Sequence, residues 1–233
     1  MQYIRSLSLS LSIDIKEINI CNKNLSILPD LSIYTCLRKL ECSGNKITQL
    51  NNLPYSLEEL NCSNNQITQL NNLPSSLQKL DCPCNQLKQL DNFPPSLQML
   101  YCNDNQITQL SNLPSSLLKL YCPYNQLSQL DNLPPSLKIL HCNYNQITQL
   151  DNLPLSLRFL GCSGNKLENN NLEYWKEQTK NKKLKLLKEK ICIRKIQRQW
   201  RKYWYDFYKY EIINGKNIGF CRLIEKSYIY YNQ

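Results

Sequence analysis

The stretch Leu57-Glu-Glu-Leu60-Asn-Cys62-Ser-Asn-Asn65-Gln-Ile67 decides the fold, because its pattern returns every 20 residues along the chain. The pattern is LxxLxCxxNx(I/L), and all copies but the last continue as xxLxxLPxS with small variations. The seven copies begin at Leu37, Leu57, Leu77, Leu97, Leu117, Leu137 and Leu157. Self-similarity at a fixed period of this length predicts a solenoid of stacked units.

A single unit has too little apolar surface to fold by itself. Burial of its six apolar positions contributes about 9–18 kcal/mol, whereas ordering its residues costs about 30 kcal/mol. In the second unit these positions are Leu57, Leu60, Cys62, Ile67, Leu70 and Leu73. Stacking on neighbouring units is therefore obligatory.

The repeat resembles the leucine-rich repeat in its short form with a Leu-Pro in the second half, similar to giant-virus leucine-rich-repeat proteins and the repeat region of bacterial secreted effectors. The resemblance covers roughly residues 15–168. It implies an α/β-type leucine-rich-repeat solenoid: a curved parallel sheet on the concave side, with one strand from each LxxLxC, and an extended, polyproline-like convex side. A proline column supports the extended return, because proline has no N–H for central-strand pairing. The column is Pro54, Pro74, Pro94, Pro114, Pro134 and Pro154.

Pattern and charge divide the chain into three parts. We expect an N-terminal cap strand and a degenerate first repeat in residues 1–36, seven repeats in residues 37–168, and a basic helical tail in residues 169–233. Ser and Leu alternate near the N-terminus, which is typical of a half-buried strand. An Asn-Gly pair at 214–215 predicts a short hairpin in the tail.

The positive charge of the chain lies entirely in the tail. Residues 1–165 contain 11 Lys or Arg and 11 Asp or Glu, so the formal net charge of +10 belongs to residues 166–233. Attraction to nucleic acid, an acidic protein or anionic lipid must therefore come from the tail.

The cysteines of the repeat occupy a position that is apolar and inward-facing in this family. We expect buried free thiols that pack as small hydrophobic groups, together with an exposed thiol at Cys84 in a turn. Disulfides are the alternative, although they are more typical of paired, irregular spacings in small secreted domains. Zinc sites need clustered pairs, so we expect no metal. Reduced cysteines favour an intracellular compartment.

The Asn that follows each strand, from Asn45 to Asn165, has a short amide that can donate to and accept from the backbone. We interpret this column as structural.

The variable strand positions predict a partner-binding surface on the concave face. Exposed aromatic residues and Met gathered on one face are typical of protein-binding hot spots. The candidates are Met99, Tyr101, Tyr121, Tyr124, Ile139, His141, Tyr144 and Phe159. Two alternatives remain open: the tail folds back over this patch, or codon bias toward Tyr produces it by chance.

The tail offers a second candidate site. Asn170 and Glu173 have capping-box spacing, which predicts a helix start there, and we expect Leu172 and Trp175 to cap the last repeat. Farther on, residues 184–207 combine apolar and basic side chains, a composition that suits a calmodulin-like partner or an anionic surface. Ile196, Gln197 and Arg201 resemble the first half of an IQ motif, a helix that calmodulin-like proteins bind. We call the candidate residues of this helix IQ-like: Ile196, Gln197, Trp200, Arg201 and Trp204. Packing on the solenoid is an equal alternative, while nucleic acid and membrane surfaces are weaker ones.

No motif in the sequence supports catalysis. We find no phosphate loop, no carboxylate pair in a plausible pocket, no nucleophile with its base and no cofactor motif. No apolar run is long enough to span a bilayer, and the alternating N-terminal residues lead us to expect no signal peptide. We therefore expect a non-enzymatic protein–protein interaction module that is intracellular, in host cytoplasm or a virion if the source is viral, with a structural component of a virion or cytoskeleton as a further alternative.

Overall fold

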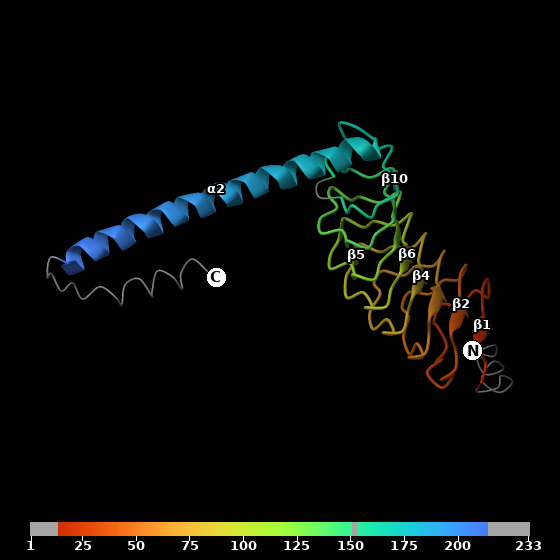
Figure 1. The fold of residues 1–233 in the computed structure, drawn as a ribbon. Coiled ribbons are helices and arrows are strands. Elements are labelled where there is room, and N and C mark those ends of the chain that lie inside the picture. The colour runs from red at the N-terminus through yellow and green to blue at the C-terminus, as the bar shows by residue number, and fades with distance from the viewer. Residues whose placement is uncertain (1–13, 151–152, 214–233) are drawn as a thin grey trace. The chain divides into compact units, whose positions relative to one another are not determined.

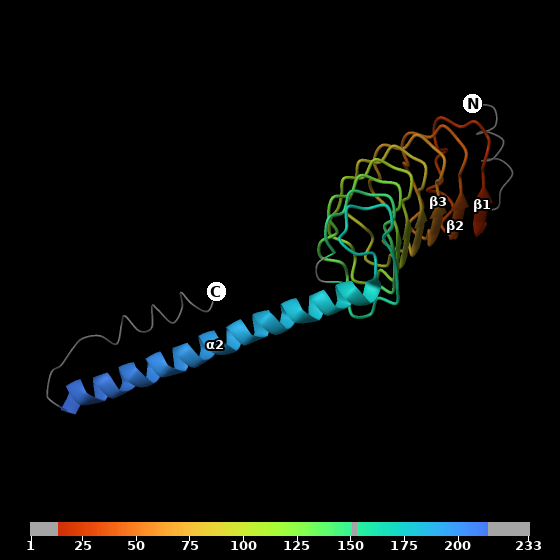
Figure 2. The same cartoon turned by 90° about the horizontal axis from the view of Figure 1, so that it is seen from above.

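A computed structural model describes residues 14–150 and 153–213, without the side chains of residues 200 and 203–213. Eight short parallel strands form one sheet, with the order β1-β2-β3-β4-β6-β8-β9-β10 (Figure 1). They are β1 (Glu17–Asn19), β2 (Lys39–Glu41), β3 (Glu59–Asn61), β4 (Lys79–Asp81), β6 (Met99–Tyr101), β8 (Lys119–Tyr121), β9 (Ile139–His141) and β10 (Phe159–Gly161). The predicted parallel solenoid is confirmed, with one strand from each of the seven repeats and β1 beside them. The coils lie in register over one another (Figure 2).

The central residue of each strand of the main sheet packs in or against the core; it is Ile18 in β1 and a leucine in the others. Leu60 and Leu80 are almost completely buried, whereas the residues on either side of them face outward. Because Leu, Cys and Ile recur at the same spacing in each repeat, they form one continuous core from Ile18 to Trp175. The core therefore runs across every layer, as the burial estimate for a single unit requires.

The return segments contain pairing that the sequence did not predict. β5 (Gln89–Leu90) and β7 (Gln109–Leu110) form a second, two-stranded parallel sheet. Serine hydroxyls also connect successive coils: Ser96 Oγ donates to the carbonyl of Leu77 at 2.7 Å. The return is thus held to its neighbours by hydrogen bonds as well as by apolar packing.

The asparagine column is structural, as expected. Asn105 Nδ2 donates to the carbonyls of Cys82 at 3.1 Å, Cys102 at 3.2 Å and Asn103 at 3.1 Å. Its Oδ1 accepts from the N–H of Leu87 at 3.0 Å. One buried amide therefore satisfies backbone groups of two coils, which a buried turn needs.

The cysteines of the repeat are free and buried, which confirms the core-packing interpretation. The seven cysteines at this repeat position are at most 1% exposed: Cys42, Cys62, Cys82, Cys102, Cys122, Cys142 and Cys162. Burial raises the pKa of Cys42 and of Cys102 to about 12. Cys84 is exposed, as expected, in a turn with φ of 53°.

Helix α2 (Leu172–Ile213) closes the repeat array with its first turns. Trp175 is 5% exposed, and its Nε1 donates to the carbonyl of Asn169 at 2.6 Å. The predicted cap residue Asn170 is wrong by one position: Asn171 Oδ1 accepts from the N–H of Glu173 at 2.7 Å. Asn171 immediately precedes the first helical residue, so it alone has the geometry of an N-cap.

The chain forms two compact units, Met1–Lys180 and Asn181–Gln233. The expected strand of alternating Ser and Leu before residue 14 lies outside the described residues, as does the hairpin near residues 214–215. Among the helices described, none is both long enough and apolar enough to cross a membrane.

We predict that Asn105→Ala lowers the free energy of unfolding by about 2–4 kcal/mol, because it leaves buried backbone groups of two coils without a partner. Urea unfolding followed by circular dichroism measures the change. Gln106→Ala is the matched control: its exposed side chain lies beside the same turn, and its effect stays within about 0.5 kcal/mol. An equal effect of both substitutions would contradict the role of the amide.

We also predict that native protein at pH 8 is alkylated by iodoacetamide at Cys36, Cys84 and Cys192, which are exposed. The thiolate is the reacting species, and burial with a raised pKa withholds it at Cys102. Mass spectrometry of labelled peptides, with urea-denatured protein as the control, gives the pattern. Rapid native labelling of the buried column would count against it.

Candidate functional site

Four rings form a stack across the face of the main sheet that points away from the core. Tyr101, Tyr121 and His141 occupy equivalent register positions of β6, β8 and β9. Ring centroids are 4.5 Å apart between the two tyrosines and 4.6 Å apart between Tyr121 and His141. Phe159 continues the stack, with its centroid 4.5 Å from that of His141. We call Tyr101, Tyr121, His141 and Phe159 the aromatic ladder.

The position of the Phe159 ring at the end of the ladder depends on a glycine. Gly161 is the register partner of His141, but it has no side chain to occupy the next position. A Cβ at Gly161 would lie 3.0 Å from His141 Nδ1. The ring of Phe159, two residues earlier on β10, stacks on His141 instead. The sequence indicated this change of stacking partner only by placing Gly161 after Tyr101, Tyr121 and His141 at the same repeat position.

A second ring pair lies in the turns that follow β8 and β9. Tyr124 and Tyr144 stack with centroids 4.6 Å apart and planes 9° from parallel. Their φ angles are 52° and 51°, and they are 52% and 53% exposed. A bulky residue rarely adopts this left-handed conformation. Gly164 occupies the equivalent place in the last repeat, where a Cβ would lie 2.5 Å from the Tyr144 ring.

The remaining predicted patch residues lie beside the ladder. Met99 and Ile139 are half-buried on the outer face of β6 and β9, with Lys119 between them in register. The structure thus brings six of the eight predicted residues onto one sheet face, and the other two into the adjacent turns.

The first half of the same face is polar, and two ion pairs lie on it. Lys39 Nζ lies 3.4 Å from Glu41, and Lys79 Nζ lies 2.8 Å from Asp81. Asn61 Nδ2 donates to Glu41 at 2.7 Å. Lys79 also lies 5.7 Å from the centre of the Tyr101 ring, where a cation–π contact joins the polar half to the ladder.

Electrostatics in the ladder favour uncharged rings. Burial lowers the pKa of His141, which keeps the imidazole neutral at pH 7. Burial, with smaller contributions from Tyr121 and Asp81, raises the pKa of the Tyr101 phenol. The ladder is therefore a neutral aromatic surface that can donate hydrogen bonds from its ring edges.

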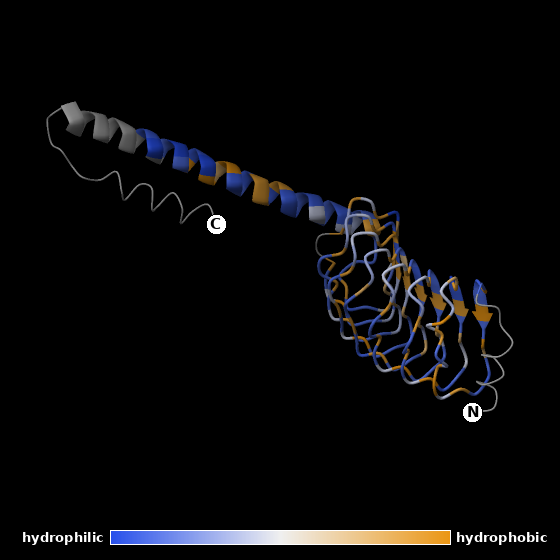
Figure 3. Ribbon diagram, turned by 90° about the horizontal axis from the view of Figure 1, so that it is seen from below, coloured by the Kyte–Doolittle hydropathy of each residue, from blue (hydrophilic) through white to orange (hydrophobic). Residues whose placement is uncertain are grey.

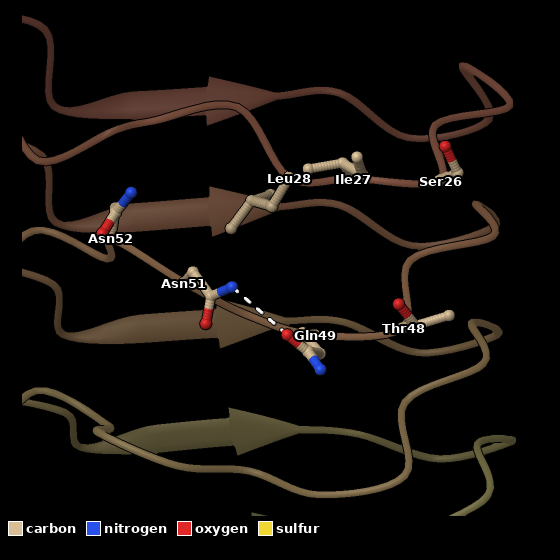
Figure 4. Close-up of a pocket in the computed structure, with 7 residues that line it drawn as sticks. All are labelled: Ser26, Ile27, Leu28, Thr48, Gln49, Asn51 and Asn52. Atoms are coloured by element: carbon tan, nitrogen blue, oxygen red, sulfur yellow. Dashed lines mark hydrogen bonds between the residues drawn. The ribbon is translucent and has the colours of Figure 1, made fainter.

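No cluster of three or more His, Cys, Asp or Glu side chains suitable for a metal occurs in the part of the chain that the structure describes. A shallow pocket of about 390 Å³ on the return segments is lined by Ser26, Ile27, Leu28, Thr48, Gln49, Asn51 and Asn52 (Figure 4). These seven side chains include no carboxylate, imidazole or thiol.

The IQ-like residues lie on α2, as the sequence predicted a helix there. Ile196 is 48% exposed, and Gln197 and Arg201 are also exposed. The side chains of Trp200 and Trp204 lie outside the described residues. The role of these five residues stays a prediction.

Comparisons with known proteins rest on three-dimensional similarity. No protein-family model matches the sequence, and no curated protein is similar to it. YopM from Yersinia enterocolitica WA-314 is 30% identical with a TM-score of 0.53, over 69% of this chain and 40% of that chain. YopM from Yersinia pestis, a leucine-rich effector protein, is 32% identical with a TM-score of 0.63, over 68% and 45%.

A third similar structure shares the cysteine feature. The functional domain of InlJ from Listeria monocytogenes, which includes a cysteine ladder, is 30% identical with a TM-score of 0.51, over 69% of this chain and 42% of that chain. The chain thus spans less than half the length of each of these three structures. Similarity to giant-virus proteins stays a prediction. Since the repeat pattern, the register of the parallel coils and the similar structures agree, the chain has the fold of a leucine-rich-repeat solenoid.

Proposed function

We propose that the chain is a non-enzymatic protein-interaction module that binds its partner across the aromatic ladder, on the face that the leucine-rich-repeat family makes concave. The proposed contacts are the ladder residues together with Met99, Ile139, Tyr124 and Tyr144. The observation that carries the proposal is the unbroken stack of four partly exposed rings at spacings of 4.5–4.6 Å.

Stacking prepares the rings for binding. Each inner ring is held between two neighbours, so the ring itself loses little side-chain freedom when a partner contacts it. Tyrosines also combine a large apolar area with a polar tip, a combination that is enriched at protein interfaces. The internally paired charges of Lys79 and Asp81 would form a polar rim beside this core.

The turn pair adds an independent argument for function. Tyr124 and Tyr144 combine a strained backbone with about half-exposed rings. Strain of this kind persists only where the surrounding structure enforces it, and it clusters at functional sites. The equivalent position is left-handed in every repeat, with Gly44, Asn64, Cys84, Asp104 and Gly164 elsewhere, so the repeat imposes the backbone and these two turns differ from the others by their bulky rings.

A second candidate function belongs to the tail, with the repeats as scaffold. Residues 184–207 would bind a calmodulin-like protein or an anionic surface through the basic, IQ-like helix. The observation that favours it is the exposure of every described side chain from Lys180 to Gln199. Nucleic acid and membrane surfaces remain weaker partners of the same segment.

An intracellular location, in host cytoplasm or a virion, is part of the same proposal. It is supported by the buried cysteine column, whose thiols pack without disulfides in the described residues.

We predict that replacing Tyr101, Tyr121 and Phe159 together by Ser abolishes partner recovery in affinity purification, because hot-spot rings each contribute about 2 kcal/mol or more. The matched control is Tyr55→Ser, which makes the same chemical change at a ring that is 71% exposed on the return side. Circular dichroism verifies that both proteins remain folded. Unchanged recovery with the triple variant would rule out the ladder as the binding surface.

Salt separates the two candidate functions. Ladder binding should change less than about threefold between low and moderate ionic strength, because neutral rings are not screened. Tail binding should weaken by about tenfold or more over the same range, since it depends on many Lys and Arg. Surface plasmon resonance with the purified partner measures both dependences, and a steep loss of ladder-dependent binding would contradict the first proposal.

A further inference from the structure

Helix α2 has a dense positive charge between Lys180 and Lys202. Eleven of these 23 residues are Lys or Arg, and Glu189 is the single acidic residue among them. A row at intervals of four consists of Lys190, Arg194, Arg198 and Lys202. Like charges at this spacing destabilise a helix, so an acidic partner along the row would stabilise it.

The same segment has aliphatic side chains on two opposite sides. One stripe consists of Leu184, Leu187 and Ile191, which are spaced by three and four residues. The other consists of Leu186, Ile193 and Ile196. At 3.6 residues per turn, Leu186 lies about 200° around the helix from Leu184. Figure 3 shows hydrophobic residues interrupting the hydrophilic helix along this part.

Both stripes are equally open. The six side chains are between 45% and 54% exposed, with no difference between the two sides. A helix that packs on one neighbour buries one stripe and exposes the other. Two open stripes within a strongly basic helix therefore need a partner that contacts both sides.

We infer that residues 184–196 are the binding segment for an acidic protein with an apolar cleft that encloses the helix. The inference rests on the second candidate function. It assigns the main apolar contacts to the two aliphatic stripes instead of Trp200 and Trp204. Charge complementarity selects an acidic occupant, and the opposed stripes select one that closes from both sides.

Other occupants satisfy only part of the pattern. A membrane surface receives one side of a helix that lies in its plane and leaves the other stripe in water. Nucleic acid neutralises the Lys and Arg but gives the aliphatic side chains no apolar contact. A second copy of the same helix would cover the stripes but double the positive charge.

Calcium-loaded calmodulin is a suitable probe, because it is acidic and its two apolar lobes grip helices. Isothermal titration of the full chain at physiological salt should give a dissociation constant in the micromolar range or tighter. The first-stripe variant L184Q/L187Q/I191Q and the second-stripe variant L186Q/I193Q/I196Q should each weaken binding by about tenfold or more. Gln preserves helix propensity, and circular dichroism verifies the helix.

The variant Y55S, on the return side of the repeats, is the control and should bind the probe like the unmodified chain. The ladder proposal is tested by its own triple variant, so failure of this inference is distinguishable from failure of that proposal. Sensitivity to one stripe alone, or no measurable binding of the probe, would overturn the inference. So would tighter binding to phosphatidylserine-containing vesicles or to a short DNA duplex, each titrated under the same conditions.

Discussion

Contact between successive coils is the constraint on which the whole structure depends. No coil can bury its own leucines, and none can satisfy the backbone of its own tight turn. The column of buried asparagines solves the second problem, because each amide bonds backbone groups of its own coil and of the coil before it. Apolar stacking solves the first, with Leu, Cys and Ile in each layer covered by the same residues of the next. The chain is consequently stable only as an array.

The same constraint produces the candidate binding surface. Parallel strands lie about 4.8 Å apart, so aromatic residues at one repeat position must stack at nearly that distance. The centroid separations of 4.5–4.6 Å between rings at equivalent positions agree with it. A core that demands strict register therefore arranges the outward-facing rings at no further conformational cost. The face changes along the array: the later repeats carry the rings, whereas the first and third units present the ion pairs Lys39–Glu41 and Lys79–Asp81.

The tail differs from the repeats in its charge balance and in the exposure of its apolar residues. Within the repeats, acidic and basic residues are balanced and the apolar positions are buried. Along α2 beyond Lys180, positive charge accumulates and the aliphatic residues stay exposed. Helix α2 thus begins as part of the repeat core at Trp175 and continues as a segment whose own surface is incompletely satisfied. Such a surface is typical of a segment that binds a partner.

The amino-acid sequence by itself determined the repeat length, the parallel strands, the inward cysteines and the structural asparagines, because each follows from a pattern that recurs at a fixed period. It also predicted which aromatic residues share a face. Tertiary structure alone decided how those residues meet: Phe159 stacks on His141 only because Gly161 leaves space, and Tyr124 and Tyr144 are held in a left-handed conformation by their turns. The pairing of β5 with β7 and the cap at Asn171 also came only from the structure. Periodicity specifies which layer and side a residue belongs to, whereas ring contacts and caps depend on side-chain directions and on space left by neighbouring coils.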